Sequence, residues 1–132
     1  MITEIETLKK NAYIYFLGSE FVIIAGKTSK DNDFISLKVA GQNDYWFHVR
    51  SVPGSHVLLR SLESREPGRK ELEQAAAVAA YYSKARNAGV VPVSCTQAKN
   101  VSKPSGVKTG TVTIRKEQVL KVRPALPNEP QE

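Results

Sequence analysis

The most regular hydrophobic pattern in the chain lies between residues 69 and 87. Its apolar positions recur at the three- and four-residue spacing of an amphipathic helix: Leu72, Ala75, Ala76, Ala79 and Tyr82. Glu71 and Glu73 lie in its first turn and Lys84 and Arg86 in its last, which matches the helix dipole. The pattern predicts one long helix over residues 69–87, with an alanine-rich face that can approach a sheet closely.

Shorter runs rich in aromatic and β-branched residues predict strands before and after this helix. The runs occupy residues 13–17, 20–25, 45–50, 56–60, 90–95, 111–115 and 118–123. Gly18-Ser19 is a turn signal between the first two runs. The order of elements therefore predicts an α+β fold, a mostly antiparallel β-sheet with one long helix packed on it and a second short helix.

The second helix is expected over residues 33–40. Asp31-Asn32-Asp33 can cap it, and Phe34, Leu37 and Ala40 then share one side. The competing interpretation is a strand with Ile35, Leu37 and Val39 pointing inward, and we favour the helix.

Length and composition suit one small domain. We expect it to span residues 1–123 of the 132, followed by a disordered tail over 124–132, which has three prolines and little to bury. No apolar run approaches the roughly 20 residues that span a bilayer, and the N-terminus lacks the apolar core of a secretory signal. Cys95 is the only cysteine, which excludes an internal disulfide. Together these features predict a cytoplasmic protein.

The net charge of +6 is unevenly distributed. Residues 1–83 hold ten basic and ten acidic residues, whereas residues 84–123 hold nine basic residues and one acid, Glu117, a balance of nine minus one, or +8. Such asymmetry favours a polyanionic partner. We expect Lys99, Lys103 and Lys108 to lie near Lys84 and Arg86 on one surface.

The run from Asp44 to Arg60 predicts a hairpin around Val52-Pro53-Gly54-Ser55. Trp46, His48 and Arg50 alternate with apolar residues and share a face. With a three-residue loop, Arg50 lies opposite His56, His48 opposite Leu58 and Trp46 opposite Arg60. A two-residue loop puts His48 opposite Leu59 and Arg50 opposite Val57. We interpret Trp46 as a core residue.

In the three-residue register, Arg50 and His56 can bind one phosphate between them, and that anion raises the pKa of the histidine. Ser55 and the backbone after Gly54 can add hydrogen-bond donors. The loop over residues 96–110 carries Lys99, Lys103 and Lys108 with no acid, which also suits phosphate.

The sequence contains no Gly-rich nucleotide motif, no nucleophile elbow and no paired-carboxylate arrangement. Cys95, His48 and His56 lack the spacing of zinc ligands, so we expect neither a metal nor any other cofactor. Cys95 follows a valine-rich strand and is interpreted as a buried, unreactive thiol.

Several short motifs, taken in order, resemble one known family. They are Gly26-Lys27 with Asn32-Asp33, Asp44 to His48, Pro53 to Val57, Ala75 to Arg86, Val91 to Thr96, and Lys99 to Gly106. The chain resembles the NFACT-R domain, the RNA-binding domain of NFACT-family ribosome quality-control factors. The family usually has arginine at the position of Lys27 and an aromatic residue at that of Cys95.

The resemblance implies a non-enzymatic module, expected here as a free-standing domain, that binds structured RNA, tRNA or rRNA. Its expected role is that of an adaptor in tRNA modification or ribosome-associated quality control, with a tRNA-modifying enzyme or the ribosome as partner. We expect the RNA-binding residues to be Lys27, Asn32, His48, Arg50, Ser55, His56, Arg86, Lys99, Lys103 and Lys108. The alternative is an enzyme, or enzyme subunit, acting on RNA through His48, His56 or Cys95.

Overall fold

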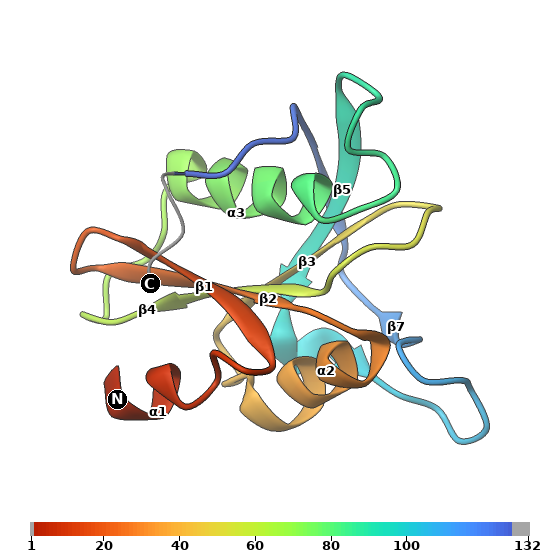
Figure 1. Ribbon diagram of the computed structural model, residues 1–132, viewed down its shortest axis with the longest axis horizontal. Helices are drawn as coiled ribbons and strands as arrows, with labels where there is room; N and C mark the ends of the chain where they lie inside the picture. Colours follow the sequence, from red (N-terminus) through yellow and green to blue (C-terminus); the bar gives the residue numbers. More distant parts are fainter. Residues whose placement is uncertain (1, 128–132) are drawn as a thin grey trace.

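A six-stranded antiparallel sheet forms the centre of the computed structural model, which describes residues 2–127 (Figure 1). Its strands lie in the order β1-β2-β4-β3-β5-β8. They are β1 (Ala12–Leu17), β2 (Phe21–Gly26), β3 (Tyr45–Val49), β4 (Val57–Ser61), β5 (Val91–Gln97) and β8 (Gln118–Val122). The short strands β6 (Val101–Ser102) and β7 (Thr113–Ile114) pair separately.

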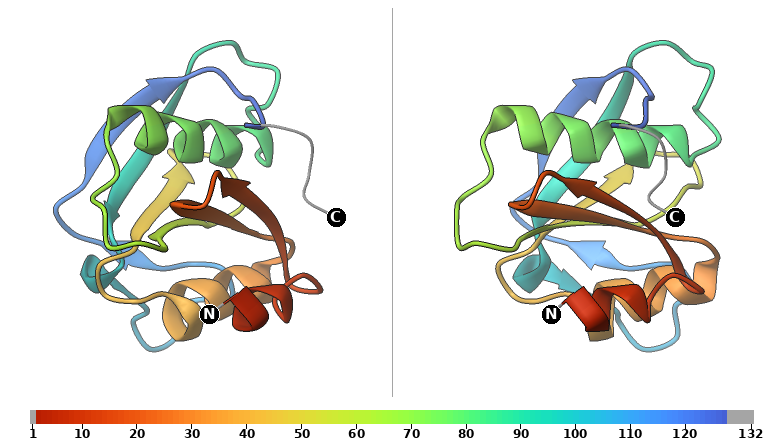
Figure 2. Two further views of the ribbon diagram at one scale, coloured as in Figure 1. Left: turned by 90° about the vertical axis from the view of Figure 1, so that its left-hand side faces the viewer. Right: turned by 60° about the vertical axis from the view of Figure 1, so that its left-hand side comes forward.

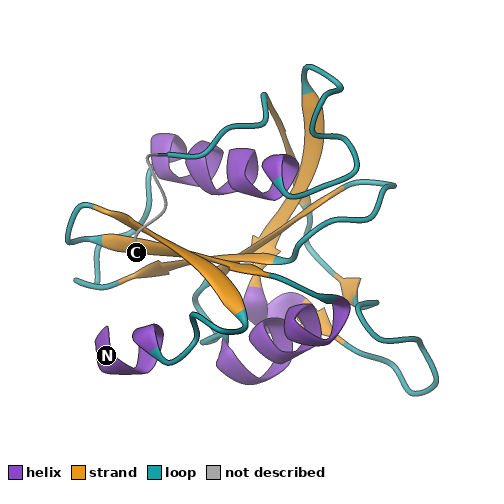
Figure 3. Ribbon diagram, in the orientation of Figure 1, coloured by secondary structure: helices purple, strands orange, loops and turns teal. Residues whose placement is uncertain are grey.

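Helices cover both faces of the sheet (Figures 1 and 2). The longest, α3 (Arg69–Tyr81), lies on one face. The other face carries α1 (Ile2–Glu6), α2 (Ser29–Phe34) and η1 (Ile35–Val39), a turn of π-helix that continues α2 (Figure 3). A 3₁₀ turn, η2 (Ala98–Asn100), follows β5. The predicted α+β class, with one long and one shorter helix, is confirmed. No helix within residues 2–127 has the length and apolar character needed to cross a membrane.

Two hydrophobic clusters hold the layers together, one on each side of the sheet. Phe47, Val57 and the alanines of α3 fill the first, and Ile5, Ile35 and Trp46 belong to the second. Every residue of β2 is buried, because its continuous apolar run supplies side chains to both clusters. The prediction that Trp46 is a core residue is confirmed.

Several expected boundaries differ from the structure. The long helix ends at Tyr81, where Tyr82 leaves the helical conformation with φ −96° and ψ 47°. The segment predicted as a strand over 111–115 contains only the two residues of β7, which pair with β6. The N-terminal helix α1 was not expected, since its few residues show no periodic apolar face.

The second helix is confirmed, but its cap and its buried side were predicted wrongly. Thr28 is the N-cap, and its hydroxyl accepts a hydrogen bond from the Asp31 backbone N–H. The helix therefore begins earlier than expected, and the residues that face the sheet differ from those predicted. Ile35 and Ser36 are buried, whereas Phe34 and Leu37 are 39% and 37% exposed.

Both expected registers of the β3–β4 hairpin are wrong. Tyr45 pairs with Leu59, Trp46 with Leu58 and Phe47 with Val57. Continuing this register places His48 opposite His56, and their rings are 5.2 Å apart. The loop is wider than a tight turn because its backbone bonds to the end of α3 instead of closing on itself.

The beginning of the expected tail contacts the domain. The Ala125 N–H donates to the Ala77 carbonyl of α3 at 3.2 Å, and Leu126 packs against the cluster beneath that helix. The prediction of disorder therefore fails for these residues, while residues 128–132 lie outside the described part of the chain.

Arg60 is the cation of a largely buried ion pair. Its guanidinium donates to both carboxylate oxygens of Asp44 at 2.8–3.2 Å and to the Val39 carbonyl at 2.8 Å. The two charged side chains are only 16% and 9% exposed. The pair joins β4 to the segment that precedes β3.

We expect Arg60→Ala to lower the free energy of unfolding by about 3 kcal/mol, because Asp44 would remain buried without its cation. The matched control is Arg69→Ala, since Arg69 is 79% exposed and pairs only with Glu73 one turn along α3. That variant should cost less than about 1 kcal/mol. Urea unfolding measures both losses, and equal losses would contradict the assignment of Arg60 as a structural residue.

Candidate nucleic-acid interface

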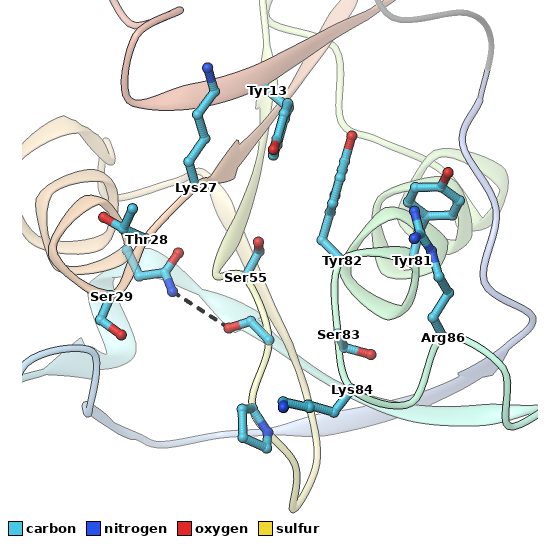
Figure 4. A pocket seen from close by; sticks show the side chains of 13 residues that line it. Tyr13, Lys27, Thr28, Ser29, Ser55, Tyr81, Tyr82, Ser83, Lys84 and Arg86 are labelled. Carbon is cyan, nitrogen blue, oxygen red and sulfur yellow. Dashed lines mark hydrogen bonds between the residues drawn. The ribbon is translucent and has the colours of Figure 1, made fainter.

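An open groove of about 550 Å³ lies where the end of α3 meets the edge of the sheet (Figure 4). Its walls come from β1, the start of α2, the β3–β4 loop and the turn after α3. The lining residues are Tyr13, Lys27, Thr28, Ser29, Asn32, Pro53, Gly54, Ser55, Tyr81, Tyr82, Ser83, Lys84 and Arg86. Residues distant in the sequence thus share one surface.

Backbone hydrogen bonds join the β3–β4 loop to the turn after α3. The Ser55 N–H donates to the Tyr82 carbonyl at 2.9 Å, and the Lys84 N–H donates to the Pro53 carbonyl at 3.0 Å. Gly54 lies between these bonds, and a Cβ on it would stand 2.7 Å from the Cβ of Ser83. Only glycine permits this approach, which places Lys84 beside the loop.

Asn32 and Ser55 form the floor of the groove. The Asn32 carboxamide oxygen accepts the His56 backbone N–H at 3.0 Å, and the Ser55 hydroxyl donates to the Gly26 carbonyl at 2.6 Å. Both residues are at most 9% exposed. Their polar atoms are committed to neighbouring backbone, so these two expected RNA-binding residues shape the groove from below.

Three tyrosines form a row across the groove. Tyr13 and Tyr82 stack with ring centroids 4.4 Å apart and planes at 2°, and Tyr81 meets Tyr82 edge to face at 5.1 Å. The Tyr82 hydroxyl hydrogen-bonds that of Tyr15 in the layer below. Burial raises the pKa of Tyr82 above its usual value, and the bond to Tyr15 raises it further, so the hydroxyl stays protonated.

A cation lies at each end of the tyrosine row. The Lys27 Nζ stands 5.1 Å from the ring centre of Tyr13, and the Arg86 guanidinium carbon stands 3.6 Å from that of Tyr81. Lys84 adds a third exposed positive charge, and none of the lining residues is acidic. The groove therefore combines clustered positive charge with aromatic surface, a combination that suits phosphates and bases.

The two histidines lie beneath this surface. His56 is 2% exposed, and its Nδ1 lies 2.8 Å from the Ser36 hydroxyl, which accepts the Trp46 indole N–H at 2.9 Å. The serine hydrogen is thus directed to Nδ1, and the ring proton belongs on Nε2. Burial lowers the pKa of His56 to about 4, and His48 acts in the same direction. Burial also lowers the pKa of His48.

This geometry corrects the expected phosphate site between Arg50 and His56. The histidine is buried and neutral, whereas Arg50 lies on the surface, 3.3 Å from the Glu117 carboxylate. The wide loop moves the two residues out of cross-strand register. Binding of RNA by Arg50 itself stays a prediction.

Lys99 does not share one surface with Lys84 and Arg86 as expected. Antiparallel pairing of β3 with β5 puts Val49 opposite Val93 and Tyr45 opposite Gln97. Lys84 is bonded to the loop beyond Val49, whereas Lys99 follows Gln97. They therefore lie at opposite ends of these strands, about five residues of extended chain apart.

Lys103 stabilises its own loop. Its ammonium group donates to the Lys108 and Thr111 carbonyls at 2.8 and 2.9 Å and pairs with the Asp33 carboxylate at 3.4 Å. These three partners match the three donors of a lysine. Lys108 is exposed on the same loop, which reaches the rim of the groove where Gly110 packs on Ser29.

Cys95 lies on the opposite face of the sheet from the histidines. It is fully buried under α3, and burial raises the pKa of its thiol to about 11. Among residues 2–127, no three His, Cys, Asp or Glu side chains gather closely enough to hold a metal ion.

The groove thus brings together four of the expected site residues, Lys27, Asn32, Ser55 and Arg86. It also contains tyrosines that the sequence reasoning missed, Tyr13, Tyr81 and Tyr82. The signal was present in Tyr81-Tyr-Ser-Lys-Ala-Arg86, where two tyrosines closely precede a lysine and an arginine. The helical pattern, however, assigned Tyr82 to the core.

The buried state of His56 predicts a pH dependence of stability. Its folded pKa of about 4 lies below the value of 6.5 for an unperturbed histidine, so the unfolded chain binds the proton first as the pH falls. Stability should be fully present above about pH 6.5 and fall by up to roughly 3 kcal/mol towards pH 4. Ring-proton NMR should show no His56 titration between pH 8 and about pH 5.5, and a midpoint near 6.5 would contradict the buried network.

Comparison with known proteins identifies relatives of most of the chain. Residues 11–116 match the model of the NFACT protein RNA binding domain. The Rqc2 homolog RqcH of Bacillus subtilis is 39% identical over 106 residues, covering 80% of this chain and 18% of that protein. The RqcH of Streptococcus suis is 39% identical over 103 residues, covering 78% and 18%.

A solved structure is also similar, that of the C-terminal part of the fibronectin/fibrinogen-binding protein from Streptococcus suis. It superposes with a TM-score of 0.80 at 35% identity, covering 87% of this chain and 46% of that one. The matched region of the curated relatives is about a fifth of their length. Every lining residue of the groove lies within residues 11–116. The chain belongs to the NFACT protein RNA-binding domain family.

Proposed function

We propose that this domain binds structured RNA, rRNA or tRNA, through the groove between the end of α3 and the edge of the sheet. The observation that carries the proposal is the meeting of three exposed cations and three tyrosines there without an acidic lining residue. Clustered cations gain affinity for RNA by releasing counterions from the phosphates, and tyrosine rings accept stacked bases.

The biological setting that we propose is ribosome-associated quality control, with ribosome-bound RNA as the partner. Support comes from the relatives, which are Rqc2 homologues. Since only about a fifth of their length is matched, the activity of the whole relatives is not proposed for this chain. Nothing among residues 2–127 favours a role in tRNA modification over this setting.

A binding role, without catalysis, is part of the proposal. The enzyme alternative named His48, His56 or Cys95, and the sheet separates the thiol from the two histidines, with Cys95 facing α3 and the histidines facing α2. Lowered pKa values keep both histidines neutral at pH 7, and the thiol stays protonated.

Affinity for a stem-loop RNA should fall steeply with salt, by roughly 0.7–0.9 log units per log unit of salt for each neutralised phosphate. Lys84→Ala and Arg86→Ala should each reduce that slope by about one contact. Fluorescence anisotropy of labelled RNA, measured across a salt series, gives the slopes.

Matched controls lie on the same helix and on the opposite face. Arg69→Ala removes an exposed arginine at the far end of α3, and Lys38→Ala removes an exposed lysine of η1. Both should keep the wild-type slope. Lys99→Ala tests whether a lysine at the other end of β5 also contributes to the salt slope. Equal reductions for all five variants would mean that RNA binding is not localised to the groove.

Cys95 should react with a thiol reagent only when the domain unfolds, because the side chain is fully buried and burial raises its pKa to about 11. Labelling of native and urea-unfolded protein with a chromogenic disulfide measures this. Cys95→Ser should leave RNA affinity unchanged. Rapid labelling of the native protein, or loss of RNA binding in the variant, would contradict the buried assignment.

A further inference from the structure

The ring of Tyr13 is supported on one side and open on the other. Tyr82 lies parallel to it at 4.4 Å, and the Tyr82 hydroxyl is fixed by its bond to Tyr15. Tyr13 is nevertheless 37% exposed, and Tyr82 stacks on only one face of its ring. A rigid stack of two aromatic rings therefore ends in an accessible ring at the mouth of the groove.

Lys27 lies on the outer side of that ring. Its Nζ stands 5.1 Å from the ring centre and donates to the Lys9 carbonyl at 2.8 Å, and Figure 4 shows Lys27 and Tyr82 on opposite sides of Tyr13. A lysine side chain that is exposed and held by one surface carbonyl can move at low cost. The outer face can thus be uncovered without changing the sheet.

The geometry points to a more specific ligand than RNA in general: we propose that the groove selects RNA with an unpaired base, which stacks on the outer face of Tyr13. This inference rests on the proposed RNA-binding function. The base extends the parallel stack of Tyr13 and Tyr82. Lys27 turns from the ring to the adjoining phosphate, while Lys84 and Arg86 bind the backbone on the other side of the groove.

Paired bases cannot make this contact, because both of their faces are covered within the helix. Recognition of RNA by aromatic rings accordingly favours loops, bulges and ends. Every base has a π-face, so stacking on Tyr13 does not by itself select the identity of the unpaired base.

The test compares two labelled RNAs with the same number of phosphates, a stem-loop and a fully paired duplex. Wild-type protein should bind the stem-loop more tightly. Tyr13→Leu should weaken stem-loop binding roughly 5- to 150-fold, the range for loss of one stacked base, and leave duplex binding unchanged. Tyr13→Phe keeps the ring and should retain the preference.

Phe34→Leu is the matched control, since Phe34 is 39% exposed on α2 and does not line the groove. It should alter neither affinity. Thermal melting checks that each variant is folded. If Tyr13→Leu fails to fold, stacking is read in the wild-type protein from quenching of a 2-aminopurine placed in the loop.

The two proposals fail in different ways. Equal wild-type affinity for both RNAs, an unchanged stem-loop affinity in folded Tyr13→Leu, or an unquenched 2-aminopurine overturns the unpaired-base inference. In each case the salt slopes of Lys84→Ala and Arg86→Ala still support the groove. Absence of binding to either RNA overturns the proposed function itself.

Discussion

The close approach of Gly54 to Ser83 is the contact on which the rest of the groove depends. Two backbone hydrogen bonds, one on each side of Gly54, hold the β3–β4 loop against the turn after α3. They stop the hairpin from closing tightly and fix where the helix ends. Because of them, Tyr82 stacks on Tyr13 of β1, and Lys84 stands above the floor that Asn32 forms.

A buried polar layer supports this arrangement from below. Asn32 binds the His56 backbone, while Ser36 links the His56 ring to the Trp46 indole. An unpaired polar group at such depth would be costly, so the network permits few alternative packings. Asn32 and Ser55 thus hold the backbone beneath the groove, while its exposed lysines, arginine and tyrosines form the proposed binding surface.

The sequence predicted those elements whose patterns are local. Alanine spacing identified α3, and β-branched runs identified the strands of the main sheet. The hairpin register could not be predicted, because loop length depended on bonds to Tyr82 and Lys84, which are distant in sequence. The same reason explains why Lys99 was wrongly expected beside Lys84, since charge order along the chain does not reveal at which end of β5 a lysine lies.

The candidate site was predicted in composition better than in geometry. A polyanion-binding surface followed from the basic segment, and Lys27 and Arg86 do line the groove. Asn32, Ser55, Lys103 and His56 were expected to bind RNA, and the structure shows that their polar groups have partners within the protein, which only burial and hydrogen bonding could reveal. Lys103 illustrates the difference: its charge suited phosphate, yet all of its donors bind Asp33 and two carbonyls. A lysine so occupied must break three interactions before it can contact RNA, whereas Lys84 lines the groove exposed and free to meet a phosphate. Under the proposed function, position in the fold, more than total charge, therefore decides which cations of this domain are expected to determine its affinity for RNA.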